Sequence, residues 1–427
     1  MNLKKYKLGE LVEVTRGMSL SGQYYSETGT LIRLTLGNFN MNGGGFKENT
    51  SKTDIYFTGP VKEEYILQEG DIITPLTEQS LGLLGTTARI PESGKYIQSQ
   101  DVALIKCKEG LIDRNFCFYL ISSNIVRQQL SAAAQQTKIR HTSPDKIKDC
   151  TVWIPNFEDQ KRIGRILTDI DSKIAINRQI NDNLEAMAKQ LYDYWFVQFD
   201  YPNEEGKPYK SSGGKMVWNE KLKREIPEGW DADALNTWLE IKSGFPFNSE
   251  TYRTTGRYKV ITIKNVQDGE LVTSGCDFVE EIPSRAKEYI ALKIGDRLIS
   301  LTGNCGRLCV VCEENLLLNQ RVGLLSCNSL YLEYLYNLLN SQPMRMVVDN
   351  LANGAAQANL SPVELCKTIC AMPQEDTLLE YNKKANAFRL AMVKNNQEIA
   401  ALTKQRDELL PLLMNGQVSV NYHLSHD

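Results

Sequence analysis

The sequence predicts an α+β protein built by internal duplication. We expect two similar domains with twisted, mostly antiparallel sheets and helices, separated by two long antiparallel coiled-coil helices. Two observations predict this fold class. An ordered series of short motifs occurs twice along the chain, which marks an internal repeat. Each copy is followed by a long segment with apolar residues at heptad spacing, which is typical of paired helices.

The repeated motifs keep their order in both halves. Residues 29–38 match residues 256–265, and each segment is typical of a strand that ends at asparagine. The other matches are residues 15–17 with 242–244, 67–73 with 292–299, 100–107 with 320–327, 143–144 with 361–362 and 154–155 with 372–373. Chance could produce one such pair but not an ordered series, so we expect pseudo-twofold symmetry.

Within each repeat, short apolar strands are broken by Gly, Asn and Thr, and a helical stretch follows late. These stretches are residues 115–129 in the first repeat and 330–346 in the second. This mixture favours an α+β domain with a mostly antiparallel sheet. Gly17 and Gly244, at matching places, are predicted to be backbone turns.

The two long segments are predicted to pair as helices. The first begins after Pro155 with a cap at Asn156 and acidic residues in its first turn. Asparagine interrupts the heptad rows at matching places, and a buried asparagine fixes register at a cost in stability. The predicted helix-pairing residues are Asn177, Leu184, Leu191, Asn395, Leu402 and Leu409, with Asn181 as a further polar layer. Arg406 also falls on the seam and fits only if it reaches a partner.

A helix of about 40 residues is roughly 60 Å long. Two such helices would act as a rigid ruler between two similar domains. DNA is the natural periodic object for such a ruler, because half-sites recur about every 34–36 Å.

Four segments carry a resemblance to a known family. Residues 154–163 (Ile-Pro-Asn-Phe-Glu-Asp-Gln-Lys-Arg-Ile) and residues 184–199 look like the entry and exit of its first conserved helix. Residues 207–230 look like its linker, and residues 409–418 look like the end of its second helix. The chain thereby resembles, over essentially its whole length, the specificity subunits of Type I restriction–modification systems. The Asn156–Glu158 entry is slightly longer than the usual pattern.

The resemblance implies an organisation along the chain. Residues 1–155 and 230–373 would be the first and second target recognition domains. Residues 156–199 and 374–416 would be the spacer helices, residues 200–229 the linker and residues 417–427 a C-terminal tail.

It also implies a role and partners. Each recognition domain would read one half of a split, asymmetric site on double-stranded DNA. The helices would space the halves and bind two modification subunits, which carry the adenine methyltransferase. Restriction subunits would add ATP-driven translocation and cleavage. The chain itself would need no cofactor.

Catalytic motifs are absent from the sequence. It contains neither a Gly-x-x-x-x-Gly-Lys-Ser/Thr phosphate loop nor an Asn-Pro-Pro or Asp-Pro-Pro methyltransferase motif. Its 3 histidines offer little for acid–base chemistry. Cys305, Cys309 and Cys312 have nearly metal-like spacing, but they lie in an apolar stretch without a clear fourth ligand. We therefore expect buried thiols rather than zinc, and a non-catalytic chain.

Composition sets further limits. No apolar run is long enough to span a bilayer, and the first residues lack the apolar stretch of a signal peptide. We therefore expect a cytoplasmic protein whose 10 cysteines are reduced. The net charge of −3 does not by itself favour nucleic-acid binding, so affinity must come from local surfaces or from a partner.

Two pairs of loops are predicted to contact DNA. The first pair precedes the two Ser-Pro motifs and offers Gln136, Lys138, Arg140 and His141 in one repeat, and Gln357 and Asn359 in the other. The second pair follows the two Gly-Asp motifs and offers Thr77 and Gln79, and Thr302, Asn304 and Arg307. Arginine suits guanine edges, and glutamine or asparagine suits adenine. The simpler interpretation is that these are solvated loops and turns.

Two rival functions remain open. The chain could be a coiled-coil adaptor that assembles proteins without DNA specificity, and salt-sensitive DNA binding would separate the two. It could also be an autonomous methyltransferase, against which the missing motifs count.

Overall fold

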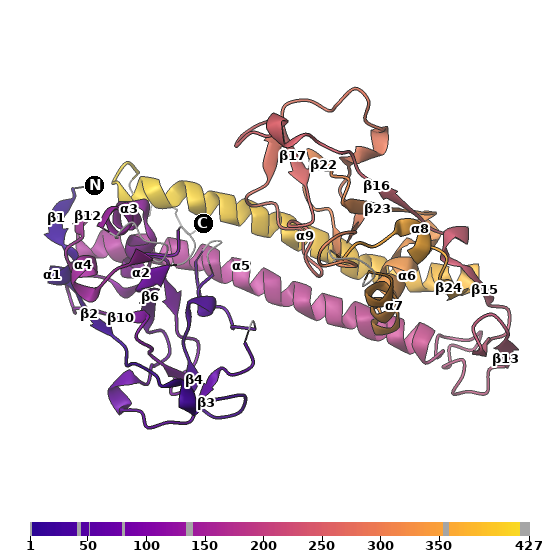
Figure 1. Cartoon of the computed structure of the whole chain (residues 1–427), viewed down its shortest axis with the longest axis horizontal. Helices are drawn as coiled ribbons and strands as arrows, with labels where there is room; N and C mark the ends of the chain where they lie inside the picture. Colours follow the sequence, from indigo (N-terminus) through magenta and orange to yellow (C-terminus); the bar gives the residue numbers. More distant parts are fainter. Residues whose placement is uncertain are drawn as a thin grey trace, which may run out of the picture. The chain divides into compact units, whose positions relative to one another are not determined.

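The computed structural model describes residues 2–40, 44–50, 52–78, 82–133, 140–352 and 358–418. The chain forms two compact units. The first contains residues 1–174 and 401–427, and the second contains residues 175–400. Two long helices, α5 (Phe157–Tyr192) and α9 (Glu375–Met414), contribute to both units (Figure 1). These are the two long helices that the sequence predicts, and they are confirmed.

The first unit contains the first repeat. Its helices are α1 (Leu8–Leu11), α2 (Arg114–Ser122), α3 (Asn124–Ala133) and α4 (Pro144–Lys148). Its strands are β1 (Lys4–Lys7), β2 (Val12–Arg16), β3 (Tyr25–Ser26), β4 (Ile32–Arg33), β5 (Tyr56–Phe57), β6 (Ile72–Pro75), β7 (Thr77–Glu78), β8 (Ala88–Arg89), β9 (Tyr96–Ile97), β10 (Val102–Cys107), β11 (Arg140–His141) and β12 (Thr151–Ile154). They form sheets of order β2-β10-β6-β8 and β3-β5-β4-β9, and the pairs β1-β12 and β11-β7.

The second unit contains the second repeat and the linker. Its shorter helices are α6 (Ser329–Asn340), α7 (Gln342–Ala352) and α8 (Pro362–Leu365). Its strands are β13 (Met216–Asn219), β14 (Arg224–Pro227), β15 (Asp231–Ala234), β16 (Glu240–Ser243), β17 (Tyr258–Ile261), β18 (Asp277–Val279), β19 (Ala291–Leu292), β20 (Arg297–Ser300), β21 (Leu308–Val310), β22 (Leu316–Leu318), β23 (Val322–Ser326) and β24 (Ile369–Met372). The sheets are β16-β23-β20-β21 and β18-β17-β22-β19, with pairs β13-β14 and β15-β24.

The two units repeat the same topology, which confirms the predicted duplication. The antiparallel sheet β2-β10-β6-β8 corresponds strand by strand to β16-β23-β20-β21. The second sheet of each unit contains one parallel pair, β4 with β9 and β17 with β22, at equivalent positions. The sheets are therefore mostly antiparallel, as the sequence predicts.

The matched strands are shorter than predicted, because β4 ends at Arg33 and β17 at Ile261, and the repeated asparagine closes the turn that follows each strand. The side-chain Oδ1 of Asn38 accepts the backbone N–H of Thr35 at 2.8 Å, and Asn265 accepts that of Thr262 at 2.8 Å. Both asparagines are buried. A side chain that bonds the backbone three residues earlier stabilises a turn. The two asparagines therefore have a structural role in the repeats.

The late helical stretches differ from the prediction. Each is broken into two helices, at Ser123 between α2 and α3 and at Ser341 between α6 and α7. Both serines have extended backbone, and the hydroxyls donate to the carbonyls of Leu120 and Leu338 at 2.6 Å and 2.7 Å. A serine hydroxyl that bonds the carbonyl three residues earlier competes with helix continuation, which explains the break.

Gly17 and Gly244 also differ from the prediction, because neither is a turn with positive φ. A Cβ atom at Gly17 would collide with the backbone carbonyls of Gln98 and Ser99, and one at Gly244 would collide with those of Leu318 and Asn319. Glycine is required at both places by the close approach of another strand.

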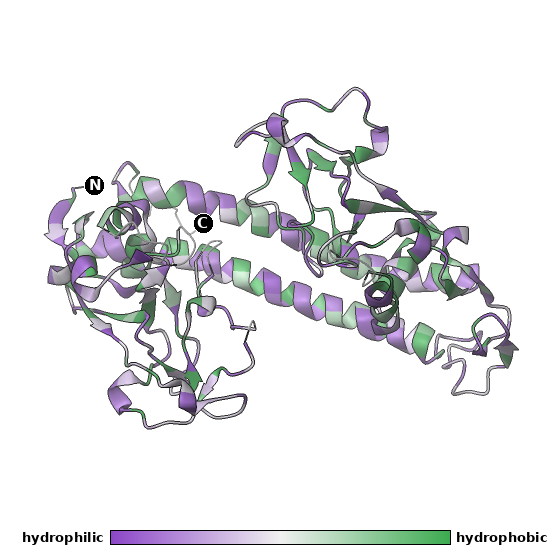
Figure 2. Ribbon diagram, in the orientation of Figure 1, coloured by the Kyte–Doolittle hydropathy of each residue, from purple (hydrophilic) through white to green (hydrophobic). Residues whose placement is uncertain are grey.

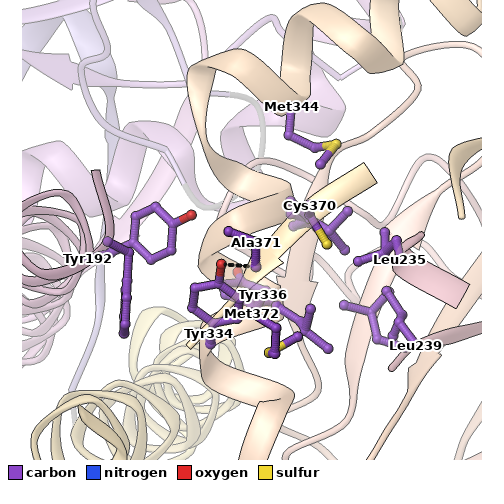
Figure 3. Packing of buried hydrophobic residues seen from close by; sticks show 14 of the residues in the cluster. Tyr192, Leu235, Leu239, Tyr334, Tyr336, Met344, Cys370, Ala371 and Met372 are labelled. Atoms are coloured by element: carbon purple, nitrogen blue, oxygen red, sulfur yellow. Dashed lines mark hydrogen bonds between the residues drawn. The ribbon is translucent and has the colours of Figure 1, made fainter. Parts of the chain in front are cut away.

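A cluster of aromatic residues lies in the core of the second unit. Phe196, just beyond α5, packs edge-on against Tyr334 and Tyr381, with ring centroids 4.8 Å and 4.7 Å apart. Figure 3 shows Tyr192 beside Tyr334, whose hydroxyl donates to the carbonyl of Ala371 at 2.6 Å. These contacts join both long helices to the second repeat.

Polar residues link the two helices within each unit. In the second unit, Asn177 donates to Glu398 at 2.7 Å and Asn181 to Asn396 at 2.7 Å. Residue numbers rise on α5 as they fall on α9, so the helices are antiparallel there. Figure 2 shows hydrophobic and hydrophilic residues alternating along both ribbons. Within the part of the chain that the structure describes, no helix is long and apolar enough to cross a membrane.

Candidate nucleic-acid interface

In the first unit, the two predicted loops meet. Strands β7 and β11 pair antiparallel, with Glu78 opposite Arg140 and Thr77 opposite His141. The segment after the Gly-Asp motif therefore lies directly beside the segment before the Ser-Pro motif. Gln79, Gln136 and Lys138 lie outside the described residues.

The side chains at this junction differ in access. His141 is exposed, whereas Thr77 is buried. Arg140 lies between these extremes, with a side chain 28% exposed. Its Nη1 is 3.9 Å from Oε1 of Glu78 and donates to Oγ of Ser131 at 3.2 Å. Arg140 and His141 are thus the predicted contacts that this junction presents to solvent.

The second unit brings its two loops together in the same way. Thr302 forms an antiparallel bridge with Asn359, and its hydroxyl donates to Oδ1 of Asn359 at 3.2 Å. Thr302 is buried like Thr77, and Asn359 is exposed like His141. Gln357 lies outside the described residues. The junction is therefore built twice, from equivalent residues of the two repeats.

An open cleft of about 580 Å³ lies at the second junction. Its lining combines polar and small apolar side chains with one charge: Ser243, Leu301, Thr302, Gln320, Arg321, Asn359, Leu360, Ser361 and Pro362. Arg321 is exposed. Among the residues the structure describes, its guanidinium makes no hydrogen bond or ion pair. The cleft therefore offers a cationic donor beside the amide of Asn359.

Sequence reasoning missed Arg321 as a site residue, although it follows Gln320 in the repeat. The sequence did contain a signal for Arg321. The matching position of the first repeat is Asp101, so the charge at this position differs in sign between the two repeats. Arg16 of the first repeat matches Ser243, and its Nε donates to the carbonyl of Gln100 at 3.0 Å. Arg16 and Arg321 thus come from different strand ends of the two repeats, and the first junction also contains Arg140.

The remaining predicted contacts lie on the hairpin between β20 and β21. Asn304 is exposed. Arg307 donates from Nη1 to Oε1 of Gln267 at 2.5 Å, and its Nε is 3.8 Å from Oδ2 of Asp268. Its charge is therefore partly satisfied within the unit, which makes it a weaker candidate than Arg321.

Two of the three cysteines are part of the core, and Cys305 is partly buried against it. Cys309 lies in β21 and is fully buried, and burial raises the pKa of its thiol. Cys312 is buried and accepts from the amide of Asn396 at 3.6 Å. Among the described residues, no group of three or more His, Cys, Asp or Glu side chains could hold a metal ion. Cys309 and Cys312 therefore pack in the core.

Comparison with known proteins gives one consistent result. Residues 2–186 match the family model of the Type I restriction modification DNA specificity domain. The MjaVIII specificity subunit of Methanocaldococcus jannaschii is 25% identical and aligns over 85% of this chain and 83% of its own length. The HindI specificity subunit of Haemophilus influenzae is 23% identical over 76% of this chain and 81% of its own.

A solved structure has the same fold. The S subunit of a Type I restriction–modification system from M. genitalium covers 97% of this chain with a TM-score of 0.58 at 16% identity, and 96% of that subunit is covered. The chain thus shares the fold of that S subunit. The family match and the relatives show more narrowly that the chain is similar to specificity subunits of Type I restriction–modification systems.

Proposed function

We propose that this chain confers DNA sequence specificity on a Type I restriction–modification complex. Each recognition domain would read one half of a bipartite, asymmetric site on double-stranded DNA in the cytoplasm. The observation that carries the proposal is the repeated junction, in which His141 meets Thr77 and Asn359 meets Thr302. Two equivalent polar junctions with different side chains suit two half-sites of different sequence.

The domain organisation belongs to the same proposal. Residues 1–155 and 230–373 would read DNA, and the helices over 156–199 and 374–416 would set the spacer. The residues proposed to fix helix pairing are Asn177, Leu184, Leu191, Asn395, Leu402 and Leu409. Their leucines are half-buried, and Asn177 is buried, which suits a seam between helices.

Two modification subunits are the proposed partners of the helices, with restriction subunits added in the full complex. An exposed apolar stripe on α5 supports a helical partner. Ile176, Ile180 and Met187 are between 41% and 52% exposed, and their spacing puts them on one face. Ile180→Asp should weaken pull-down of the modification subunit, whereas Gln179→Asp, also exposed, should not.

The chain by itself is proposed to be non-catalytic. The support for this part is the sequence, which contains neither a phosphate loop nor an Asn-Pro-Pro or Asp-Pro-Pro methyltransferase motif. Methyl transfer by the purified chain, free of other subunits, would contradict this part of the proposal.

Methylome sequencing tests the function. The chain is expressed in a host that lacks other methyltransferases, together with a modification subunit that forms a complex with it. We expect methylation at one bipartite motif with a fixed spacer. A complex that assembles but binds DNA without sequence preference would instead favour the adaptor role.

A further inference from the structure

A buried carboxylate lies beneath Arg140 in the first unit. Glu78 is the last residue of β7, and its side chain is only 3% exposed. A buried charge is unfavourable unless hydrogen bonds and an opposite charge compensate it. The contacts of Glu78 therefore show what this residue does.

One oxygen of the carboxylate binds the turn that follows β7. Oε2 accepts the backbone N–H groups of Gly82, Leu83 and Leu84 at 3.1 Å, 2.9 Å and 3.0 Å. Hydrogen bonds to an ionised acceptor are stronger than neutral ones. Glu78 thereby holds residues 82–84 against the end of β7 and leaves Oε1 for another group.

That other group is Arg140, which lies directly opposite Glu78 in the β7–β11 pair. Its Nη1 is 3.9 Å from Oε1 of Glu78, and the same nitrogen donates to Oγ of Ser131 at 3.2 Å. Among the described residues, Nε and Nη2 make no hydrogen bond. The guanidinium is thus fixed through one nitrogen, while its bidentate edge remains for an outside acceptor.

The second unit builds the same junction without these charges. Gly303 follows Thr302 where Glu78 follows Thr77, and Ala358 precedes Asn359 where Arg140 precedes His141. The backbone of Gly303 bonds Ala358 instead, with N–H to carbonyl at 2.9 Å. Because the second junction forms without the ion pair, the pairing of the two strands does not by itself require an arginine opposite Glu78.

We propose that Glu78 is a positioning residue for DNA reading by Arg140. It holds the guanidinium so that Nε and Nη2 meet the O6 and N7 acceptors of one guanine in the first half-site. A guanidinium fixed before binding loses less conformational freedom when it binds. This inference rests on the proposed DNA-reading function and names the residue that makes one contact selective.

The test is a double-mutant cycle in the full chain with its modification subunits. Binding is measured for the natural site and for sites with each base pair of the first half-site replaced. Arg140→Ala should lose discrimination at one G·C pair by roughly 5- to 150-fold. Glu78→Gln should lose most of the same discrimination, because its amide can present a donor to Arg140. In the Arg140→Ala background, Glu78→Gln should cost nothing further.

Controls separate positioning from folding. Glu69→Gln changes an exposed carboxylate of the same unit and should behave like the wild type, and all variants should keep second half-site discrimination. Thermal unfolding checks that each variant is folded. If Glu78→Gln does not fold, Glu78→Asp replaces it, because it keeps the charge but is one methylene shorter, and it should also lose discrimination.

The outcomes are distinct. The positioning role is overturned if Glu78→Gln or Glu78→Asp discriminates like the wild type, or if Glu78→Gln costs as much without Arg140 as with it. A wild-type complex without any sequence preference would contradict the proposed function itself, and the positioning role with it.

Discussion

Asn395 donates a hydrogen bond from Nδ2 to Oδ1 of Asn181 at 3.0 Å, across the seam between α9 and α5 in the second unit. Nδ2 of Asn181 in turn donates to Oδ1 of Asn396 at 2.7 Å. The sequence marks Asn181 and Asn395 as polar interruptions, and the structure brings them together. A polar layer in an apolar seam specifies register at a cost in stability.

Replacing this polar layer should affect thermal stability and helix alignment differently. The double variant Asn181→Leu, Asn395→Leu should keep or raise the midpoint of thermal unfolding, because leucines pack well in a seam. The spacer in methylated sites should become less uniform, because alternative alignments of the helices are no longer penalised. Asn183→Leu, an exposed position on α5, serves as the control. A double variant with one unchanged spacer would show that other residues set the register.

Helix length should set the spacer directly. Four residues inserted after Asn181 and four after Lys394 lie at matching positions of the antiparallel pair. They lengthen the helices by about one turn, roughly 5.4 Å, and one base pair advances the duplex by about 3.4 Å. We expect a preferred spacer longer by one or two base pairs, with both half-site sequences unchanged. Methylome sequencing measures the spacer length. An unaltered spacer would contradict the hypothesis that helix length sets the distance between the half-sites.

Arg406 should be a stability residue of the first unit. This seam arginine donates from Nη1 to Oδ1 of Asp171 at 2.9 Å, while Oδ2 of Asp171 accepts from the Tyr119 hydroxyl at 2.6 Å. Arg406→Ala should lower the free energy of unfolding by about 1–3 kcal/mol. This is less than the roughly 3–5 kcal/mol of a fully buried pair, because Asp171 is 31% exposed. In urea unfolding, Lys404→Ala should change little, and equal losses for both variants would contradict this role.

Cys107 should be more reactive than the fully buried thiols. Its hydrogen bond with Cys117 lowers the pKa of the Cys107 thiol, whereas burial raises the pKa of Cys309. A lowered pKa means more thiolate at a given pH below it, and the thiolate is the nucleophile. Iodoacetamide at pH 7.5 should therefore label Cys107 well before Cys309. Cys117→Ala should slow labelling of Cys107, and an unchanged rate would show that this hydrogen bond is unimportant.

The sequence was most informative where local patterns decide structure. The duplication was visible because Thr35 and Asn38, like Thr262 and Asn265, form a turn within four residues. The helix breaks at Ser123 and Ser341 were missed, because apolar periodicity continues through them and only the serine hydroxyls reveal the change.

The candidate site was less predictable because it depends on distant segments. Glu78 and Arg140 become neighbours only through the pairing of β7 with β11. The cleft beside Arg321 is assembled from four separate stretches of the second repeat. Spacing along the chain contains no information on such contacts, so the sequence indicated the loops but not the side chains that meet there.

Arg321 should be the principal cationic contact of the second half-site. It is exposed at the cleft beside Asn359 and, among the described residues, its guanidinium has no partner. Arg345 is a matched control, because its Nη2 already donates to Asp268 at 2.7 Å and to Asn340 at 2.8 Å. We expect Arg321→Ala to weaken DNA binding and Arg345→Ala to have a much smaller effect.

The form of the loss distinguishes two kinds of contact. If Arg321 reads a base, Arg321→Ala should cost about 1–3 kcal/mol and relax specificity at one position of the second half-site. If it binds a phosphate, the loss should be uniform across sequences and the salt slope should fall by about one. Competition binding at several salt concentrations, with each half-site scrambled in turn, measures both quantities. Because Asp101 occupies the matching position of the first repeat, scrambling the first half-site should cost the variant as much as the wild type. A variant that binds every DNA like the wild type would remove Arg321 from the interface.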